Sequence, residues 1–121
     1  MKNKIEEIVL LARSKGFVSD VSVIHENYKV ADGNVTRNLL NYLLLAEMQK
    51  WLRDKHGLIV ESVNYFSLTK YALKIHTIEE GEFTGTVTDS TRDVNNRVTY
   101  KTYEEALLKG LLEAFKLIKN K

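Results

Sequence analysis

Residues 57–80 read GLIVESVNYFSLTKYALKIHTIEE, and at their start the hydrophobic pattern of the chain changes from helical to alternating. The alternation predicts two strands, 58–66 and 71–79, because successive side chains of a strand point to opposite faces of a sheet. Residues 67–70 predict the turn between them. The second strand places apolar and polar residues on opposite faces, with Tyr71, Leu73 and Ile75 on one and Lys74 and His76 on the other.

Downstream of these strands the pattern predicts further sheet. Gly81 precedes a third strand at 83–88, in which threonines alternate with other residues. Asn95-Asn96 is typical of a two-residue hairpin turn and predicts a fourth strand at about 97–101. The sequence therefore predicts a meander of three or four antiparallel strands.

Two helices are predicted upstream of the strands. Apolar residues recur at helical spacing over about 3–15, and Gly16 follows as a stop signal. A second helical pattern runs from about 36 to 56, with Gly57 placed as a left-handed cap. The segment 17–35 supports at most one short strand and is expected to be a packed connection.

A last helix is predicted from Tyr103 to about Ile118. Thr102 and Glu105 have the spacing of a capping box, in which each side chain satisfies a backbone N–H of the first turn. Gly110 lies in a row of small residues spaced by four, so we expect a neighbouring backbone to approach it closely on the sheet.

Together these elements predict a single α+β domain over residues 1–121. The meander is expected to pack against the helices at 36–56 and 103–118, with the N-terminal helix on the periphery. Trp51 shares a helix face with Leu44, Met48 and Leu52, which predicts that its ring is buried against the sheet.

Two segments carry a resemblance. The segments QKWLRDKH (49–56) and TYEEALLKGLLEAFKLI (102–118) resemble a family of short uncharacterised proteins encoded by phages and mobile elements of Bacteroides-type bacteria. The resemblance covers roughly residues 40–118. It implies a cytoplasmic accessory protein, and it brings no known activity, cofactor or catalytic residue.

Composition narrows the function classes further. The chain has no cysteine, which excludes disulfides, thiolate nucleophiles and iron-sulfur sites. Eighteen basic and sixteen acidic residues leave a net charge of +2, too balanced to bind nucleic acid through bulk charge. The longest apolar stretch, 39–46, is far below the roughly 18 to 20 residues that span a bilayer, and no export signal is visible. We expect a cytoplasmic protein that does not insert into a membrane.

Candidate chemistry is sparse. His25, His56 and His76 lack the spacing of a metal site, and His76 is expected to be a solvated sheet residue. The loop 89–93 holds two carboxylates, two hydroxyls and a guanidinium, which is also ordinary turn composition. We therefore predict no catalytic, cofactor-binding or metal-binding residues.

The absence of catalytic motifs leaves three hypotheses about function. The leading hypothesis is a non-enzymatic module that binds an unidentified protein partner. Nucleic-acid binding is the alternative, since helix, three strands and helix is the order of double-stranded RNA-binding domains; the contacts would be Lys50, Arg53 and Lys55. A small hydrolase or nuclease is third.

Self-association is a separate expectation. The first half of the 36–56 helix has apolar residues on almost its whole circumference, which needs cover on two sides. A homodimer would supply this cover through Leu39, Tyr42 and Leu43, unless the helix at 3–15 supplies it within one chain.

Overall fold

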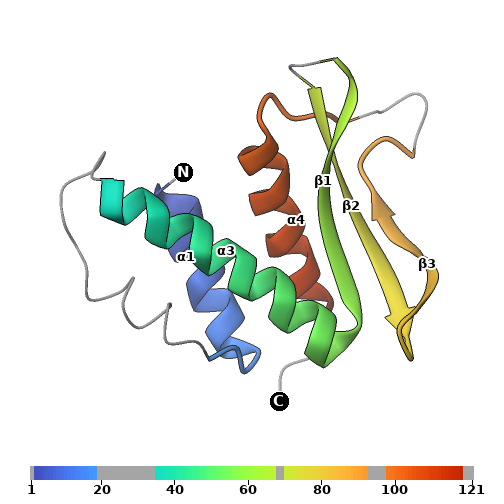
Figure 1. Ribbon diagram of the computed structural model, residues 1–121, viewed down its shortest axis with the longest axis horizontal. Helices are drawn as coiled ribbons and strands as arrows, with labels where there is room; N and C mark the ends of the chain where they lie inside the picture. The colour runs from blue at the N-terminus through green and yellow to red at the C-terminus, as the bar shows by residue number, and fades with distance from the viewer. Residues whose placement is uncertain (1, 19–34, 68–69, 93–97, 119–121) are drawn as a thin grey trace.

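The computed structural model describes residues 2–18, 35–67, 70–92 and 98–118, and these form an α+β domain (Figure 1). All of its helices lie on one side of an antiparallel sheet. In chain order the described elements are α1 (Lys2–Ser14), α3 (Val35–His56), β1 (Leu58–Ser67), β2 (Lys70–Glu79), β3 (Glu82–Asp89) and α4 (Tyr103–Leu117). The predicted fold class and element order are confirmed.

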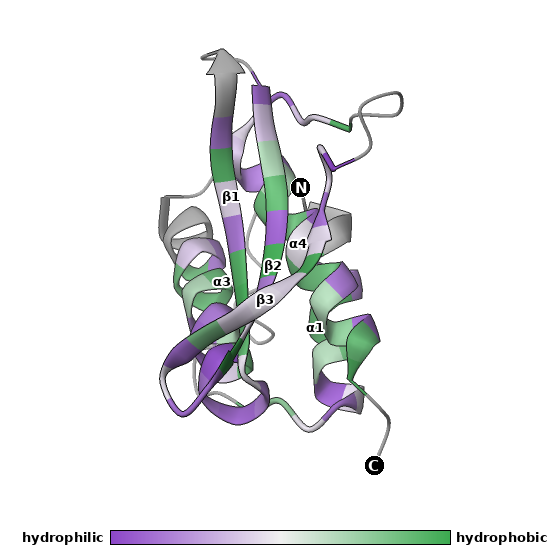
Figure 2. Cartoon of the chain, turned by 90° about the vertical axis from the view of Figure 1, so that its right-hand side faces the viewer, coloured by the Kyte–Doolittle hydropathy of each residue, from purple (hydrophilic) through white to green (hydrophobic). Residues whose placement is uncertain are grey.

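The sheet has the strand order β1-β2-β3, and both pairs are antiparallel. Glu61 of β1 lies opposite Lys74 of β2, and His76 lies opposite Thr86 of β3. The register of β3 shifts twice, between Ile75 and His76 and between Thr77 and Ile78 of its partner strand. Because such bulges increase the local twist, β3 crosses in front of the other two strands (Figure 2).

The predicted fourth strand is reduced to one bridge among the described residues. Tyr100 exchanges two backbone hydrogen bonds with Tyr71 at 2.8 Å each. Thr102 follows two residues later as the N-cap of α4, which leaves no length for a strand after Tyr100. The hairpin turn predicted at 95–96 lies outside the described residues, as do positions 19–34 of the predicted connection.

Gly57 joins α3 to β1 in the left-handed conformation, with φ of 62°, as the cap pattern predicts. Its N–H donates to the carbonyl of Arg53 at 3.1 Å, and its own carbonyl accepts from Ile78 at 2.8 Å. A Cβ at this position would lie 2.6 Å from the Ile78 carbonyl oxygen. Only glycine fits here, and the end of α3 is therefore tied to the end of β2.

Helix α4 packs directly on the sheet. Its N-cap Thr102 accepts a hydrogen bond from the Glu105 N–H at 3.1 Å. Gly110 is buried, and a Cβ added there would lie 2.8 Å from Cγ1 of Val60 and 3.7 Å from Cβ of Leu73. The predicted close approach exists, but the nearest group is a valine methyl and not a backbone.

Helix α1 belongs to the core, and the prediction of a peripheral helix is wrong. Ile5, Ile8 and Ala12 are almost completely buried, in one cluster with the residues of α3, α4 and the sheet. The reason is that α4 has buried apolar residues on more than its sheet-facing side, and α1 packs against α4.

The ring of Trp51 is half-buried and lies between helices, not against the sheet as predicted. It stacks on Phe115 of α4 with 5.9 Å between ring centroids, and Phe17 meets its edge at 5.7 Å. Phe17 follows α1 and fills this space, which the sequence pattern of α3 alone did not reveal.

Candidate functional site

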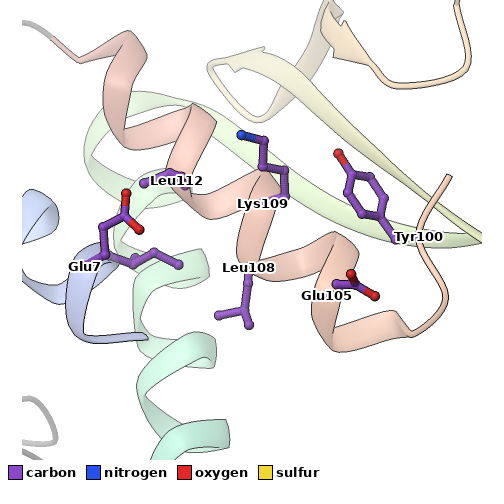
Figure 3. A pocket seen from close by; sticks show the side chains of 7 residues that line it. Glu7, Tyr100, Glu105, Leu108, Lys109 and Leu112 are labelled. Atoms are coloured by element: carbon purple, nitrogen blue, oxygen red, sulfur yellow. The ribbon is translucent and has the colours of Figure 1, made fainter. Parts of the chain in front are cut away.

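A pocket of about 180 Å³ opens between α1, α4 and the backbone at Tyr100 (Figure 3). Its floor is apolar, with Ile8 and Leu108 buried and Leu112 half-buried. Its rim is polar and consists of Glu7, Tyr100, Glu105 and Lys109.

The lining residues come from three places that the core fixes. Ile8 anchors α1 in the core, which leaves the preceding Glu7 exposed at the rim. The backbone bridge between Tyr71 and Tyr100 holds the phenol ring beside α4. In Figure 3, Glu7 lies on one side of Leu108, and Glu105 and Tyr100 lie on the other.

Glu105 connects helix capping to the pocket. The sequence predicts that its carboxylate bonds back to the N–H of Thr102, but only the bond from the Glu105 N–H to Thr102 is present among the described residues. Neither the Glu105 carboxylate nor that of Glu7 forms a hydrogen bond or ion pair within the described part of the chain. Both carboxylates therefore lie at the rim without a hydrogen-bonded partner among the described side chains.

The positive charge at the rim is already engaged. Nζ of Lys109 lies 3.0 Å from a carboxylate oxygen of Glu113, which is one helical turn further along α4. This hydrogen bond raises the pKa of Lys109 above its usual value, against a smaller opposing effect of burial. The pocket rim therefore has an excess of negative charge.

Tyr100 supplies a neutral wall to the pocket. Burial raises the pKa of its phenol above 10.0, and the nearby Lys109 partly opposes this shift. The side chain thus offers a hydroxyl and an aromatic face at physiological pH.

The volume and lining restrict what the pocket can hold. Sites for small organic molecules and cofactors are typically roughly 300 to 1,000 Å³, well above this cavity. An apolar floor under an acidic rim matches an amphipathic cation of the size of one side chain. No local sequence pattern predicts this site, because Glu7, Tyr100 and Glu105 come from separate segments and only Glu105 belongs to a recognisable pattern, the capping box.

The basic residues predicted for nucleic acid lie at the far end of α3. Lys50, Arg53 and Lys55 are all exposed, and Nε of Arg53 lies 3.3 Å from a carboxylate oxygen of Asp54. Their role as phosphate contacts stays a prediction.

Two of the three residues predicted for self-association are exposed, and the side chain of the third is not described. Tyr42 and Leu43 are 52% and 44% exposed, while the neighbouring Leu44 and Leu45 are buried. The side chain of Leu39 lies outside the described residues. Helix α1 therefore does not cover the Tyr42 and Leu43 side of α3, and the surplus of apolar residues noted in the sequence is present at the surface.

The loop after β3 uses its polar groups within its own turn and in contacts with β2 and β3. Oδ1 of Asp89 accepts from the N–H and the hydroxyl of Thr91 at 2.9 and 2.8 Å. Burial acts to raise the pKa of Asp89, but these bonds and the nearby cations Lys74 and Arg92 lower it overall. Asp93, the second carboxylate of the predicted loop, lies outside the described residues.

His76 is not a solvated residue, and that prediction is wrong. Its side chain is only 12% exposed because the Phe83 ring of the crossing strand β3 lies 5.0 Å away. Its Nε2 lies 3.0 Å from a Glu61 carboxylate oxygen and its Nδ1 lies 2.9 Å from the Thr86 hydroxyl. This chain of carboxylate, imidazole and hydroxyl crosses all three strands and joins them.

The other histidines are not part of the hydrogen-bond network of Glu61, His76 and Thr86. His56 is the last residue of α3, as the sequence predicts, and its ring lies 4.7 Å from that of Trp51. His25 lies outside the described residues. Within the described ranges, no cluster of three or more His, Cys, Asp or Glu is arranged to hold a metal ion.

Of the helices in the described part of the chain, none combines the length and the apolar character that crossing a membrane requires. Searches with protein-family models, against curated proteins and against solved structures gave no match.

Proposed function

We propose that this protein is a non-enzymatic interaction module and that it binds a protein partner at the pocket between α1 and α4. The observation that carries the proposal is the pair of carboxylates, Glu7 and Glu105, that lie above an apolar floor and have no hydrogen bond or ion pair with a described side chain. A partner side chain placed there would cover apolar surface and neutralise charge in one step.

The surface around the pocket supports a macromolecular partner. Leu10 lies one turn beyond Glu7 on α1 and is 68% exposed. Exposed apolar side chains next to a pocket are the composition that protein partners cover.

Binding of nucleic acid at this pocket is disfavoured by charge. Phosphate groups would meet Glu7 and Glu105 at the rim, and like charges repel. The alternative function would have to use Lys50, Arg53 and Lys55 at the distant end of α3. A small hydrolase or nuclease, the third hypothesis, has no support from the pocket lining.

The test of the proposed function is selection from a library of random peptides. We expect selected peptides to bind the wild-type chain and to lose affinity for the Glu7→Gln, Glu105→Gln double variant. The matched control is Glu6→Gln, Glu104→Gln, because it changes the net charge equally and neither residue lines the pocket. No selected peptides, or peptides that bind both double variants alike, would contradict the proposal.

A titration with duplex DNA and RNA tests the alternative. Phosphate binding through Lys50, Arg53 and Lys55 would weaken with salt, with a slope of roughly 0.9 per neutralised phosphate on DNA. We expect no such binding at physiological salt. Salt-dependent binding that is lost when all three residues are changed to glutamate would replace the protein-interaction proposal.

Homodimer formation through α3 is a second candidate. It rests on the exposure of Tyr42 and Leu43 on one helix. Light scattering over a range of concentrations should show a dimer, and Leu43→Lys should make it a folded monomer because that side chain is exposed. A wild-type chain that stays monomeric at high concentration would rule the dimer out.

The biological setting completes the proposal. The segments 49–56 and 102–118 support an accessory protein of a phage or mobile element that acts in the cytoplasm. In that setting the partner would be a protein of the host or of the mobile element itself.

A further inference from the structure

We propose that the pocket between α1 and α4 binds one arginine side chain of the partner protein. This inference rests on the proposed function and adds the chemistry of the partner. Four observations support arginine: the size of the cavity, its apolar floor, the positions of the two carboxylates and the Tyr100 ring.

The cavity and its floor match the stem of a long basic side chain. Its volume of about 180 Å³ holds a few carbon and nitrogen atoms and not a larger ligand. Ile8, Leu108 and Leu112 offer apolar surface at the floor. Arginine buries its methylene groups on such surfaces and keeps its charged end at the rim.

The two carboxylates belong to different helices and lie on different sides of Leu108 (Figure 3). A planar guanidinium has five N–H donors in a fixed fork and can donate in two directions at once. The compact ammonium of lysine is more strongly hydrated and acts as a point charge. Two separated acceptors therefore favour arginine over lysine.

The third wall is aromatic. Tyr100 places its ring beside Glu105 at the rim (Figure 3). A guanidinium stacks on an aromatic face through cation–π attraction, and the phenol oxygen can accept one of its N–H groups. The ring thus adds a contact that depends on the planar shape of the group.

Lys109 does not fill the place of the incoming cation. Its Nζ is held by Glu113 at 3.0 Å. In Figure 3 its amine end points away from Glu105. The charge of Glu113 is used in this pair. The charge of Glu7 also acts on Lys109, but neither Glu7 nor Glu105 forms an ion pair with a described side chain.

The test uses three small probes that share a butyl stem: n-butylguanidinium, n-butylammonium and neutral n-butylurea. Each is titrated into the labelled protein while backbone amide shifts are followed by NMR. We expect saturable shifts at the pocket residues of α1 and α4 with butylguanidinium, weaker ones with butylammonium and none with butylurea. Equal binding of the ammonium or the urea would overturn the assignment to arginine, as would the absence of saturable shifts.

Variants separate the site from general charge attraction. Glu105→Gln should weaken butylguanidinium by roughly tenfold, the loss of about one charge-assisted hydrogen bond, and Glu104→Gln should leave it unchanged. Tyr100→Leu removes the ring and the hydroxyl. It should also lower the affinity for butylguanidinium and reduce the ratio of this affinity to that for butylammonium. Equal effects of the Glu104 and Glu105 variants would overturn the proposal.

The peptides selected for the proposed function distinguish the two claims. Pocket-dependent peptides that lack arginine, or that tolerate arginine replaced by citrulline, would overturn this inference and leave the proposed function standing. Butylguanidinium binding without any selected peptide would overturn both, because the pocket would then serve a free cationic ligand. Pocket-dependent peptides that require one arginine support both.

Discussion

Helix α4 has two opposite faces that differ in how closely they are packed. On the sheet side, Gly110 lies so close to Val60 that not even a methyl group fits without a shift. On the opposite side, Glu105, Lys109 and Leu112 border a cavity, and Glu105 has no partner for its carboxylate among the described residues. One face of α4 is therefore closely packed against the sheet, while the opposite face borders a cavity.

This difference identifies which residues serve stability and which are available for binding. Side chains that fill the sheet side contribute through packing and burial. Carboxylates that form no ion pair or hydrogen bond among the described residues are expected to contribute little to folding, and the proposed function assigns them to recognition. The following predictions test this division, beginning with the largest effect.

Two adjacent leucines of α4 give the sharpest contrast. Leu111 is completely buried, and Leu111→Ala should destabilise the domain by about 2 to 5 kcal/mol through lost contacts and a cavity. Leu112 is half-buried at the pocket, and Leu112→Ala should cost about 1 kcal/mol or less. Urea unfolding of both variants measures the difference. Equal losses would mean that the pocket side is as tightly packed as the core.

A larger side chain on the sheet-facing side of α4 should cause the next largest loss of stability. Gly110→Leu should destabilise the domain by about 1 to 3 kcal/mol, because the new side chain collides with Val60. Thermal melts of the single variants and of Gly110→Leu combined with Val60→Ala complete a double-mutant cycle. The second change should offset part of the loss. A Gly110→Leu melt within error of the parent would show that α4 is oriented differently.

Substitutions of Thr102 and of Glu105 should differ in their effect on stability, because only Thr102 makes a capping hydrogen bond with its side chain. Thr102→Ala should cost about 1 kcal/mol, because its hydroxyl is the acceptor for the Glu105 N–H. Glu105→Gln should change the stability by less than about 0.5 kcal/mol, because its carboxylate makes no bond back to the cap. Comparable losses in the two variants, measured by urea unfolding, would restore the full capping box and argue against a role for Glu105 in recognition.

The smallest effect concerns pH. Lys109 and Tyr100 both have raised pKa values in the folded chain, so their contribution to stability is full below the unfolded values, 10.5 and 10.0. It is lost as pH rises through the folded values. The free energy of unfolding should therefore fall in this alkaline range, and less steeply in Tyr100→Phe or Glu113→Gln. A wild-type slope that neither change alters would contradict the pairing seen at the pocket rim.

Much of the fold is predictable from local patterns. The alternation in 58–66 and 71–79 and the glycine at 57 predict β1, β2 and the end of α3, because each depends on residues close together in sequence. The position of α1 and the ring contact of Phe17 with Trp51 are not predictable in this way. They depend on how distant helices share one core.

The pocket was even less accessible to sequence reasoning. Local patterns predict only that Tyr100 ends a strand and that Glu105 belongs to a helix cap. Their meeting with Glu7 depends on the tertiary position of α1. His76 shows the same limitation, since the bulged path of β3 buries a residue that alternation alone assigns to solvent.

The two bulges of β3 also bear on assembly. A neighbouring molecule can extend a sheet only along an uninterrupted row of backbone N–H and C=O groups, and bulges break that row. The guanidinium of Arg92 donates to the Thr86 carbonyl at 3.0 Å and occupies one acceptor of the strand. Fibrillar growth from this edge is therefore disfavoured. The proposed dimer and the proposed partner complex do not use this edge, since both involve the helical side of the molecule.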